Sequence, residues 1–317
     1  MLRIQYHRYG GPDVMRLEDV EVPEPGRGQV RIRVRAASAN PADWKVRAGD
    51  LRLVSGRRFP RGLGHDFAGV VDAVGPGVTR VRVGDEVFGI QSIRNSGAFA
   101  QYLITPEKNA FTKPAALSFE QAAALPMASA TAWSAVVDKA KVKPGQSVFI
   151  SGCLGGVGRA AAQIARMRGA DVAGSCSASG IGEARELGLS EAFDYRTFDP
   201  VGYPDRFDAV VDAAAALSVT QCNAMLKRGG NVVFVDFSPA KLAAILTSSR
   251  HHLAQGTPSP AHMNGIADAA KQGTLAAKIA RTVPLTDAVE ALTDLEMTGT
   301  PKGKLVITPD PQAGNGG

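Results

Sequence analysis

Between Ser147 and Cys176 the chain reads SVFISGCLGGVGRAAAQIARMRGADVAGSC. An apolar strand leads into a glycine turn, a helix rich in alanine, and a second strand. Gly152, Gly155 and Gly158 stand at GxxGxxG spacing where the strand becomes the helix. Residues without Cβ let the backbone bend tightly and let a pyrophosphate approach the N–H groups at the helix start, where the helix dipole favours negative charge. The stretch therefore predicts a dinucleotide-binding βαβ unit.

The end of the second strand indicates which dinucleotide binds. In NAD sites an Asp or Glu about 20 residues after the first glycine holds the ribose 2′-hydroxyl. Here the sequence is GSCS, and the first carboxylate that follows is Glu183. A carboxylate would repel a 2′-phosphate, whereas hydroxyl groups can donate to it. The pattern favours NADP, with Ser175 and Ser177 receiving the 2′-phosphate; ordinary polar residues at a strand end are the alternative interpretation.

Length and composition set the class of protein. A chain of 317 residues has room for two domains, and 44% hydrophobic with 21% charged residues is typical of a soluble globular protein. No apolar run reaches the roughly 20 residues of a membrane span, and the first residues lack an apolar signal region, so we expect a cytoplasmic protein. The three cysteines, Cys153, Cys176 and Cys222, form no CxxC pair, which argues against a disulfide framework or a cysteine-rich zinc site.

Because the net charge is +6, nucleic acid has to be considered as a partner. Within residues 30–36, however, arginines alternate with apolar residues, which predicts the solvent face of a half-buried strand. The arginines of LRLVSGRRFPRG, residues 51–62, cluster in a loop-like segment. They are either a solvated loop or, as a hypothesis, recognise an acidic or phenolate-bearing substrate through Arg57 and Arg58. With 6% aromatic residues and no aromatic stripe on a basic face, nucleic acid is not the predicted partner.

The pattern along the chain predicts an α/β protein with two domains. Short strands separated by Gly and Pro fill the first third, which favours a small β-barrel-type domain. From about Ser118 a helix is followed by alternating strands and helices, the pattern of a doubly wound parallel sheet. Ligands bind at the carboxyl ends of such strands. This predicts one common edge for a set of residues: Gly152, Ser175, Tyr195, Asp212 and Phe234.

The ordered motifs NPADWKVRAG, GLGHDFAGVV, VGDEVFG, GAFAQY, AALPMASATAW, SGCLGGVG, FDYR and GKLVI together define a resemblance. The chain resembles the zinc-independent, zeta-crystallin-like quinone oxidoreductases of the medium-chain dehydrogenase/reductase superfamily. The resemblance implies a GroES-like catalytic domain over residues 1–121 completed by 283–310, and a Rossmann NADP-binding domain over 122–282. It also implies an active site in the cleft between them, a homodimer, and reduction of quinones or α,β-unsaturated carbonyls by NADPH. Residues 311–317 are predicted to fray.

The same comparison indicates that zinc is absent. Zinc members of the superfamily have a cysteine where this chain has Asn40, a His-Glu pair where it has His65-Asp66, and a third ligand near Met127. Catalytic zinc needs three ligands of His, Cys or carboxylate type, and only His65 could serve in the usual way. Without a Lewis acid, hydride addition to an acceptor that is already electrophilic is the favoured chemistry. We expect His65 to be a hydrogen-bonded structural histidine rather than an acid.

The resemblance assigns catalytic positions to Asn40, Asp43 and Lys45 of NPADWK. Lys45 is the candidate donor to the acceptor oxygen, because an ammonium stabilises an enolate or hydroquinone anion. A surface lysine paired to Asp43 or Asp66 is the alternative.

On the cofactor side, Gly155, Gly156 and Val157 would offer their backbone to the pyrophosphate, and Tyr195 of the DYR motif would lie against the adenosine. Family members often carry a cation after the serine, where this chain has ASG, so Arg196 is the candidate to replace it. The predicted cofactor-binding set also includes Thr131, Gly152 and Phe234. Where the family has FDVVLDTVGG, this chain has FDAVVDAAAAL, which exchanges flexible glycine for helix-favouring alanine and predicts a stiffer edge.

Three functions remain open from the sequence. The first is an NADPH-dependent quinone or enone reductase acting on a small molecule. The second is a pathway-specific enoyl or ketone reductase of secondary metabolism. The third is a non-enzymatic role in binding NADPH or RNA, which the resemblance allows and the composition disfavours.

Overall fold

The computed structural model describes residues 1–236, 238–257, 259–299 and 303–309. The chain divides into two units, one made of Met1–Met127 with the chain from residue 258 onward, the other of Ala128–Thr257. The functional domain boundaries expected at residues 121 and 283 stay predictions beside these units. The tail expected to fray, residues 311–317, lies outside the described residues.

The second unit is built on a six-stranded sheet with the order β11-β10-β9-β12-β13-β14, in which all neighbours pair in parallel. Relative to the chain this is the order 3-2-1-4-5-6 of the doubly wound dinucleotide-binding fold. The strands are β9 (Ser147–Ser151), β10 (Asp171–Cys176), β11 (Glu191–Asp194), β12 (Phe207–Asp212), β13 (Leu226–Phe234) and β14 (His251–Leu253).

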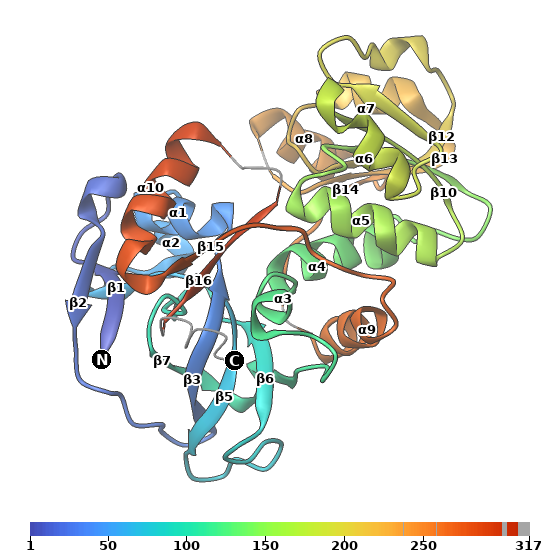
Figure 1. Ribbon diagram of the computed structural model, residues 1–317. Helices are drawn as coiled ribbons and strands as arrows, with labels where there is room; N and C mark the ends of the chain where they lie inside the picture. The colour runs from blue at the N-terminus through green and yellow to red at the C-terminus, as the bar shows by residue number, and fades with distance from the viewer. Residues whose placement is uncertain (237, 258, 300–302, 310–317) are drawn as a thin grey trace. The chain divides into compact units, whose positions relative to one another are not determined.

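The helices of this unit connect the strands (Figure 1). They are α5 (Gly156–Met167), α6 (Ile181–Glu186), α7 (Val219–Met225) and α8 (Pro239–Thr247). α5 packs on β9 and β10 through its buried alanines, whose small side chains let the helix lie close to the sheet. Under α7, the rings of Phe149 and Phe207 join the apolar core. The expected parallel α/β arrangement is confirmed.

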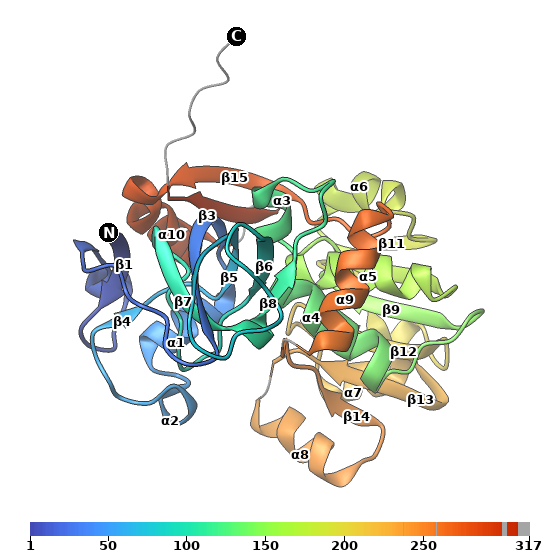
Figure 2. The ribbon, with the colours of Figure 1, turned by 90° about the horizontal axis from the view of Figure 1, so that it is seen from below.

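The first unit is built on a seven-stranded sheet in which β15 and β16, from the end of the chain, continue the sheet beyond β3 (Figure 2). Its strands are β3 (Gln29–Ser38), β5 (Asp66–Val74), β6 (Glu86–Ile90), β7 (Tyr102–Pro106), β8 (Ala110–Thr112), β15 (Ile279–Pro284) and β16 (Lys304–Thr308). A smaller sheet has the order β2-β1-β4, formed by β1 (Leu2–Tyr6), β2 (Arg16–Asp19) and β4 (Arg61–Gly62).

The remaining helices are α1 (Pro41–Ala48), α2 (Arg52–Ser55), α3 (Phe119–Ala123), α4 (Pro126–Trp133), α9 (Pro260–Lys271) and α10 (Ala288–Thr298). None of the described helices combines the length and the apolar character that a bilayer crossing requires. In β3 the apolar residues are buried and the arginines between them reach solvent, as the alternation predicted.

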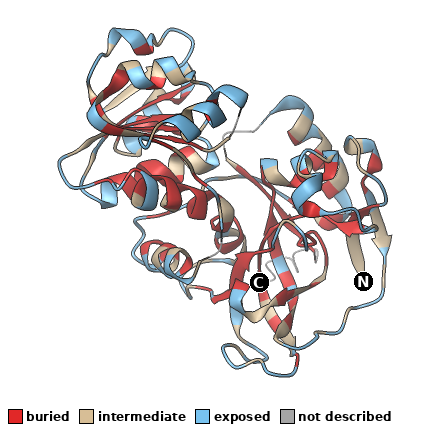
Figure 3. Cartoon of the chain, turned by 180° about the vertical axis from the view of Figure 1, so that it is seen from behind, coloured by how far each residue is buried: buried red, intermediate tan, exposed pale blue. Residues whose placement is uncertain are grey.

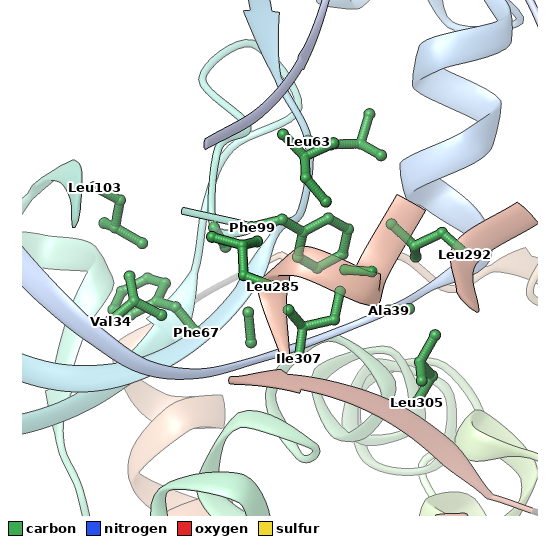
Figure 4. Close-up of a cluster of buried hydrophobic side chains, with 14 of the residues drawn as sticks. Val34, Ala39, Leu63, Phe67, Phe99, Leu103, Leu285, Leu292, Leu305 and Ile307 are labelled. Carbon is green, nitrogen blue, oxygen red and sulfur yellow. The ribbon is translucent and has the colours of Figure 1, made fainter. Parts of the chain in front are cut away.

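The core of the first unit lies between its sheet and α10. Figure 4 shows the ring of Phe99 among aliphatic side chains that include Leu285 and Ile307. Figure 3 shows the same concentration of buried residues along the central strands of each sheet. Burying a side chain of the size of Ile307 contributes about 1.5–3 kcal/mol. Strand β16 is therefore held to the sheet by packing as well as by its backbone hydrogen bonds to β3.

Candidate active site

The glycine turn joins β9 to α5 in the conformation that the spacing predicted. Gly152 has a φ of 61°, in the left-handed region that favours glycine. A Cβ on Gly158 would lie 2.1 Å from the carbonyl oxygen of Gly152, so helix and turn approach more closely than a side chain permits. Gly155 is the N-cap of α5, and no side chain of the described residues caps this helix. The backbone N–H groups of Gly156 and Val157 therefore begin a helix whose start is shaped to receive an anion.

The end of β10 lies next to the turn, because β10 pairs with β9, and the end of β11 lies one strand further along the same edge. The two strands finish in register, so Ser177 and Tyr195 each follow their strand end side by side. Tyr195 is 55% exposed, and the guanidinium carbon of Arg196 lies 5.5 Å from the centre of its ring. Ser175, by contrast, is only 5% exposed within β10. The structure thus brings Ser177, Tyr195 and Arg196 to one edge and keeps the Ser175 side chain inside the sheet.

Glu183, the first carboxylate after β10, is held by an ion pair with the guanidinium of Arg159. A carboxylate neutralised in this way is a poor partner for a ribose hydroxyl.

Two further predicted cofactor residues have buried side chains. Phe234 ends β13 at the carboxyl edge, but its ring is fully buried, stacked on His251 and beneath the ammonium of Lys241. Thr131 lies in α4 and is 8% exposed. At Phe234 only the backbone is left at the edge, so its predicted contact with the cofactor would be a main-chain one.

A charged network around Asp212, which the sequence placed at this edge without its partners, occupies the point where the strand order reverses, between β9 and β12. The hydroxyl of Ser151 donates to Asp212 Oδ1 at 2.6 Å. Lys241 Nζ donates to Asp212 Oδ2 and to Asp236 Oδ1, each at 2.8 Å. Asp212 is fully buried, and its charge is compensated by this buried ammonium. The signal for Lys241 was weak, a Ser-Pro helix start in a segment without motifs.

Next to this network, the alanines that replace the family's glycines lie in a turn after β12, and the stiffer edge expected from them stays a prediction. Ala215 has a φ of 58°, in the left-handed region where a Cβ is unfavourable. A Cβ placed on Gly152 would come 2.7 Å from the Cβ of Ala214, so this segment also lies against the glycine turn. The alanines therefore strain this edge of the sheet locally.

In the first unit the predicted catalytic residues begin α1. Asn40 is its N-cap, and the Asn40 backbone N–H donates to Asp43 Oδ2 at 2.7 Å. The other oxygen, Asp43 Oδ1, lies 2.5 Å from His65 Nδ1. All three side chains are at most 4% exposed. Among the described residues His65 Nε2 is buried and has no hydrogen-bond partner. Asp43 is thus fully engaged in holding the helix start and the imidazole.

Asp66 and Lys304 extend this cluster. The Asn40 amide donates to Asp66 Oδ2 at 2.9 Å and the Met127 backbone N–H donates to Asp66 Oδ1 at 3.0 Å. Lys304 Nζ donates to Asn40 Oδ1 at 2.6 Å and lies 3.9 Å from Asp66 Oδ2. Burial raises the pKa of Asp66 to about 6, although the Lys304 ammonium and the Asn40 hydrogen bond act in the opposite direction. Burial also lowers the pKa of Lys304.

Sequence reasoning missed Lys304, although a single charge in the apolar strand KLVIT could have signalled it.

Lys45 is exposed on α1, two residues after Asp43. Residues two apart on a helix point in different directions, which separates Lys45 from the buried cluster. The alternative pairing of Lys45 with Asp43 or Asp66 is wrong, because His65 and Lys304 hold those carboxylates, and no ion pair of Lys45 is found in the described part of the chain.

The donor set of this unit does not suit a catalytic zinc ion. Of the three positions at which zinc members have ligands, Asn40 is bonded to Lys304 and Asp66, and Met127 contributes its backbone to Asp66. Only His65 remains as a ligand of the usual type, and three are needed. Within the described ranges no group of three or more His, Cys, Asp or Glu side chains could hold a metal ion.

Comparison with known families defines the class. Residues 26–115 match the family described as alcohol dehydrogenase GroES-like domain, and residues 187–307 match the one described as zinc-binding dehydrogenase. With the parallel sheet and glycine turn above, these matches define an oxidoreductase of the dehydrogenase type, a class that works with a nicotinamide cofactor.

Two relatives and two solved structures narrow the class. The chain is 30% identical to a chloroplastic quinone-oxidoreductase homolog of Spinacia oleracea, over 98% of both chains. It is 33% identical to 2-methylene-furan-3-one reductase of Solanum lycopersicum, over 96% of this chain and 78% of that protein. The quinone oxidoreductase from Coxiella burnetii superposes with a TM-score of 0.86 at 30% identity, over 98% of this chain and 99% of that one. A structure titled NAD-dependent alcohol dehydrogenase gives 0.85, also at 30% identity, over 98% and 100%.

The chain belongs to the quinone oxidoreductase family of the medium-chain dehydrogenase/reductase superfamily.

Proposed function

We propose that this protein transfers hydride from NADPH to a quinone or an α,β-unsaturated carbonyl without a metal ion. The observation that carries the proposal is the glycine turn together with its neighbouring edge, where Ser177, Tyr195 and Arg196 stand beside a helix start without a side-chain cap. Hydroxyl and guanidinium groups suit a 2′-phosphate, and the carboxylate that would oppose it, Glu183, is neutralised by Arg159.

The residues of the first unit would act on the acceptor. When bound, NADPH supplies the hydride, and the charge that develops falls on the acceptor's carbonyl oxygen. Lys45 is the proposed donor to that oxygen, since its ammonium is exposed and no ion pair engages it among the described residues. Asn40 and Asp43 are proposed positioning residues, because their hydrogen bonds fix the start of the helix that carries Lys45.

Two features weigh on the choice of cofactor and acceptor. The structural neighbour titled NAD-dependent shows that fold likeness alone does not select NADPH. The tomato relative, named a 2-methylene-furan-3-one reductase, supports an enone as acceptor and gives weight to a pathway-specific enone reductase as the second candidate function.

Cellular setting and assembly belong to the proposal as well. A cytoplasmic location is supported by Cys153, Cys176 and Cys222, which are all free and buried, as in proteins of reducing compartments. A homodimer is proposed by resemblance to the family.

The test is consumption of NADPH and of NADH by the purified protein against matched quinones, enones and saturated ketones, before and after treatment with a chelator. We expect turnover of quinones or enones only, with NADPH preferred and chelator without effect. Arg196→Gln should raise KM for NADPH about tenfold and leave KM for NADH unchanged, as expected for one lost charge-assisted contact to the 2′-phosphate. Equal use of both cofactors, or equal effects of the substitution on both, would contradict the choice of NADPH.

A further inference from the structure

A cavity of about 790 Å³ lies within the first unit, apart from the buried cluster around Asn40. Its walls come from the start of β1, the α2 segment, residues 91–97 and β7. This volume falls in the range of pockets that hold small organic molecules, roughly 300–1,000 Å³. No residue of the predicted cofactor-binding set lines this cavity, and neither do Asn40, Asp43 and Lys45, whereas Arg57 and Arg58, the hypothetical contacts of an acidic substrate, do.

Five arginines line this cavity, and no aspartate or glutamate of the described chain does. They are Arg3, Arg57, Arg58, Arg61 and Arg94. Elsewhere the buried or half-buried arginines have carboxylate partners, as Arg47 has in Glu296 and Arg31 has in Asp72. Like charges gathered without counter-charges repel one another, so the arrangement is stabilised when an anion binds among them.

Arg61 is built into the cavity wall. It is 7% exposed, and its guanidinium donates to four backbone carbonyls: those of Ser55, Gly56, Ile93 and Arg94. Carbonyl oxygens satisfy hydrogen bonds but do not neutralise the charge. Its Nε is buried and has no hydrogen-bond partner among the described residues.

Arg3 is a second fixed cation, and its Nε is likewise buried without a partner in the described part of the chain. Its guanidinium lies over two glycines: a Cβ on Gly62 would come 2.3 Å from Arg3 Nη2, and one on Gly97 would come 3.5 Å from the same atom. At Gly62 a side chain could not coexist with the guanidinium in this position. Glycine at positions 62 and 97 therefore leaves room for the guanidinium of Arg3, which has no carboxylate partner among the described residues.

Exposed residues at the mouth of the cavity add further positive charge and apolar surface. Arg57 and Arg58 are exposed, and no ion pair or hydrogen bond of their side chains is found among the described residues. Arg94 Nε donates to the Val54 carbonyl at 3.0 Å, tying residues 91–97 to the α2 segment. Leu53 is 92% exposed, an unusual state for a leucine beside a cavity.

We propose that this cavity binds a small organic anion, with an apolar body against Leu53 and Val54 and at least one carboxylate or phosphate group among Arg57, Arg58 and Arg61. The sequence suggested that Arg57 and Arg58 recognise an acidic substrate, and this cavity is the proposed location of the acidic group. The proposal does not depend on the reductase activity. The anionic group belongs either to the electron acceptor or to a separate ligand, and the experiment distinguishes these sources.

The test is calorimetric titration of the full-length protein, saturated with NADP⁺ so that the glycine turn is not available to the probe. The probes are 2-naphthoate and its neutral counterpart 2-naphthamide, which share one apolar body. Naphthoate should bind at one site and at least tenfold more tightly than the amide. Replacing both mouth arginines, Arg57→Gln with Arg58→Gln, should weaken naphthoate binding about tenfold or more and leave amide binding unchanged.

The matched control carries the same change of charge on the same unit at two exposed arginines outside the cavity, Arg27→Gln with Arg82→Gln. Control protein should bind naphthoate like the wild type. No saturable binding, equal binding of acid and amide, or equal losses in both double variants would overturn the proposal.

A reductase assay then separates the two sources. Competition between naphthoate and the acceptor, with KM raised for anionic acceptors only in the Arg57/Arg58 variant, assigns the site to the acceptor's own anionic group. Binding of naphthoate without effect on KM assigns it to a separate ligand.

Discussion

Ala215 holds a conformation that its side chain disfavours, beside the buried carboxylate of Asp212. The left-handed region costs a residue with a Cβ about 1–2 kcal/mol, whereas a new glycine costs about 0.4–1 kcal/mol through the greater freedom of the unfolded chain. Ala215→Gly should therefore raise the free energy of unfolding by up to about 1 kcal/mol, as measured by urea denaturation. The matched change Ala216→Gly, at a residue without positive φ, should lower it. If both substitutions stabilised the protein, or if neither did, the proposed backbone strain at Ala215 would be wrong.

Asp66 should give the stability of the protein a distinctive dependence on pH. Its pKa is raised from 3.8 to about 6, so between these values the folded chain binds more protons than the unfolded chain. The contribution of Asp66 to the free energy of unfolding therefore falls as pH rises through this window, by at most about 3 kcal/mol. Asp66→Asn removes the titrating group. Urea denaturation from pH 4 to pH 7 should show that the wild type loses stability relative to the variant as pH rises. A gain relative to the variant would mean that the Lys304 charge outweighs burial and that the pKa of Asp66 is lowered.

At the scale of elements, the junction of β9 and α5 depends on the closeness of Gly158 to the Gly152 carbonyl. Gly158→Ala would place its Cβ 2.1 Å from that oxygen, and backbone cannot move aside cheaply. We expect a loss of about 1–3 kcal/mol in the free energy of unfolding and loss of NADPH binding. Gly182→Ala is the control, because a Cβ there meets nothing within 4 Å inside α6.

This control should be neutral or slightly stabilising, since alanine favours helix by up to about 1 kcal/mol over glycine. Fluorescence titration with NADPH and urea denaturation of both variants measure the difference. Unimpaired NADPH binding by the Gly158 variant would show that the turn is not the cofactor site.

The elements that the sequence predicted well are those with local signals. Glycine spacing and strand–helix alternation are read over a few tens of residues, and both predicted the parallel sheet correctly. The positions of Ser175 and Phe234 near the carboxyl edge were predicted from the sequence. The burial of their side chains was not, because it depends on what packs against the sheet on the side to which each side chain points. From their helix propensity the alanines of residues 213–216 were predicted only to stiffen this edge, and that propensity gives no sign of the positive φ of Ala215.

At the scale of the whole molecule, the features that sequence reasoning missed are contacts between distant residues. Lys304 bonds to Asn40 across 264 positions, because β16 returns to pair with β3. No local sequence pattern predicts such a partner. The one local indication was a lysine in the otherwise apolar strand KLVIT. Likewise the arginine-lined cavity is formed by β1, β7, residues 53–62 and residues 91–97, which are distant in the sequence. The sequence therefore suggested an acidic ligand but did not show that these segments meet.

The proposed reaction is transfer of hydride from NADPH to an electron-poor acceptor without a metal ion. The most direct measurement uses chelator-treated protein, NADPH carrying two deuterium atoms at C4, and an α,β-unsaturated ketone, with mass spectrometry of the reduced ketone. We expect one deuterium on carbon in the product, formed at a rate that chelation leaves unchanged. A product without deuterium, or activity that disappears with the chelator and returns with zinc, would contradict it.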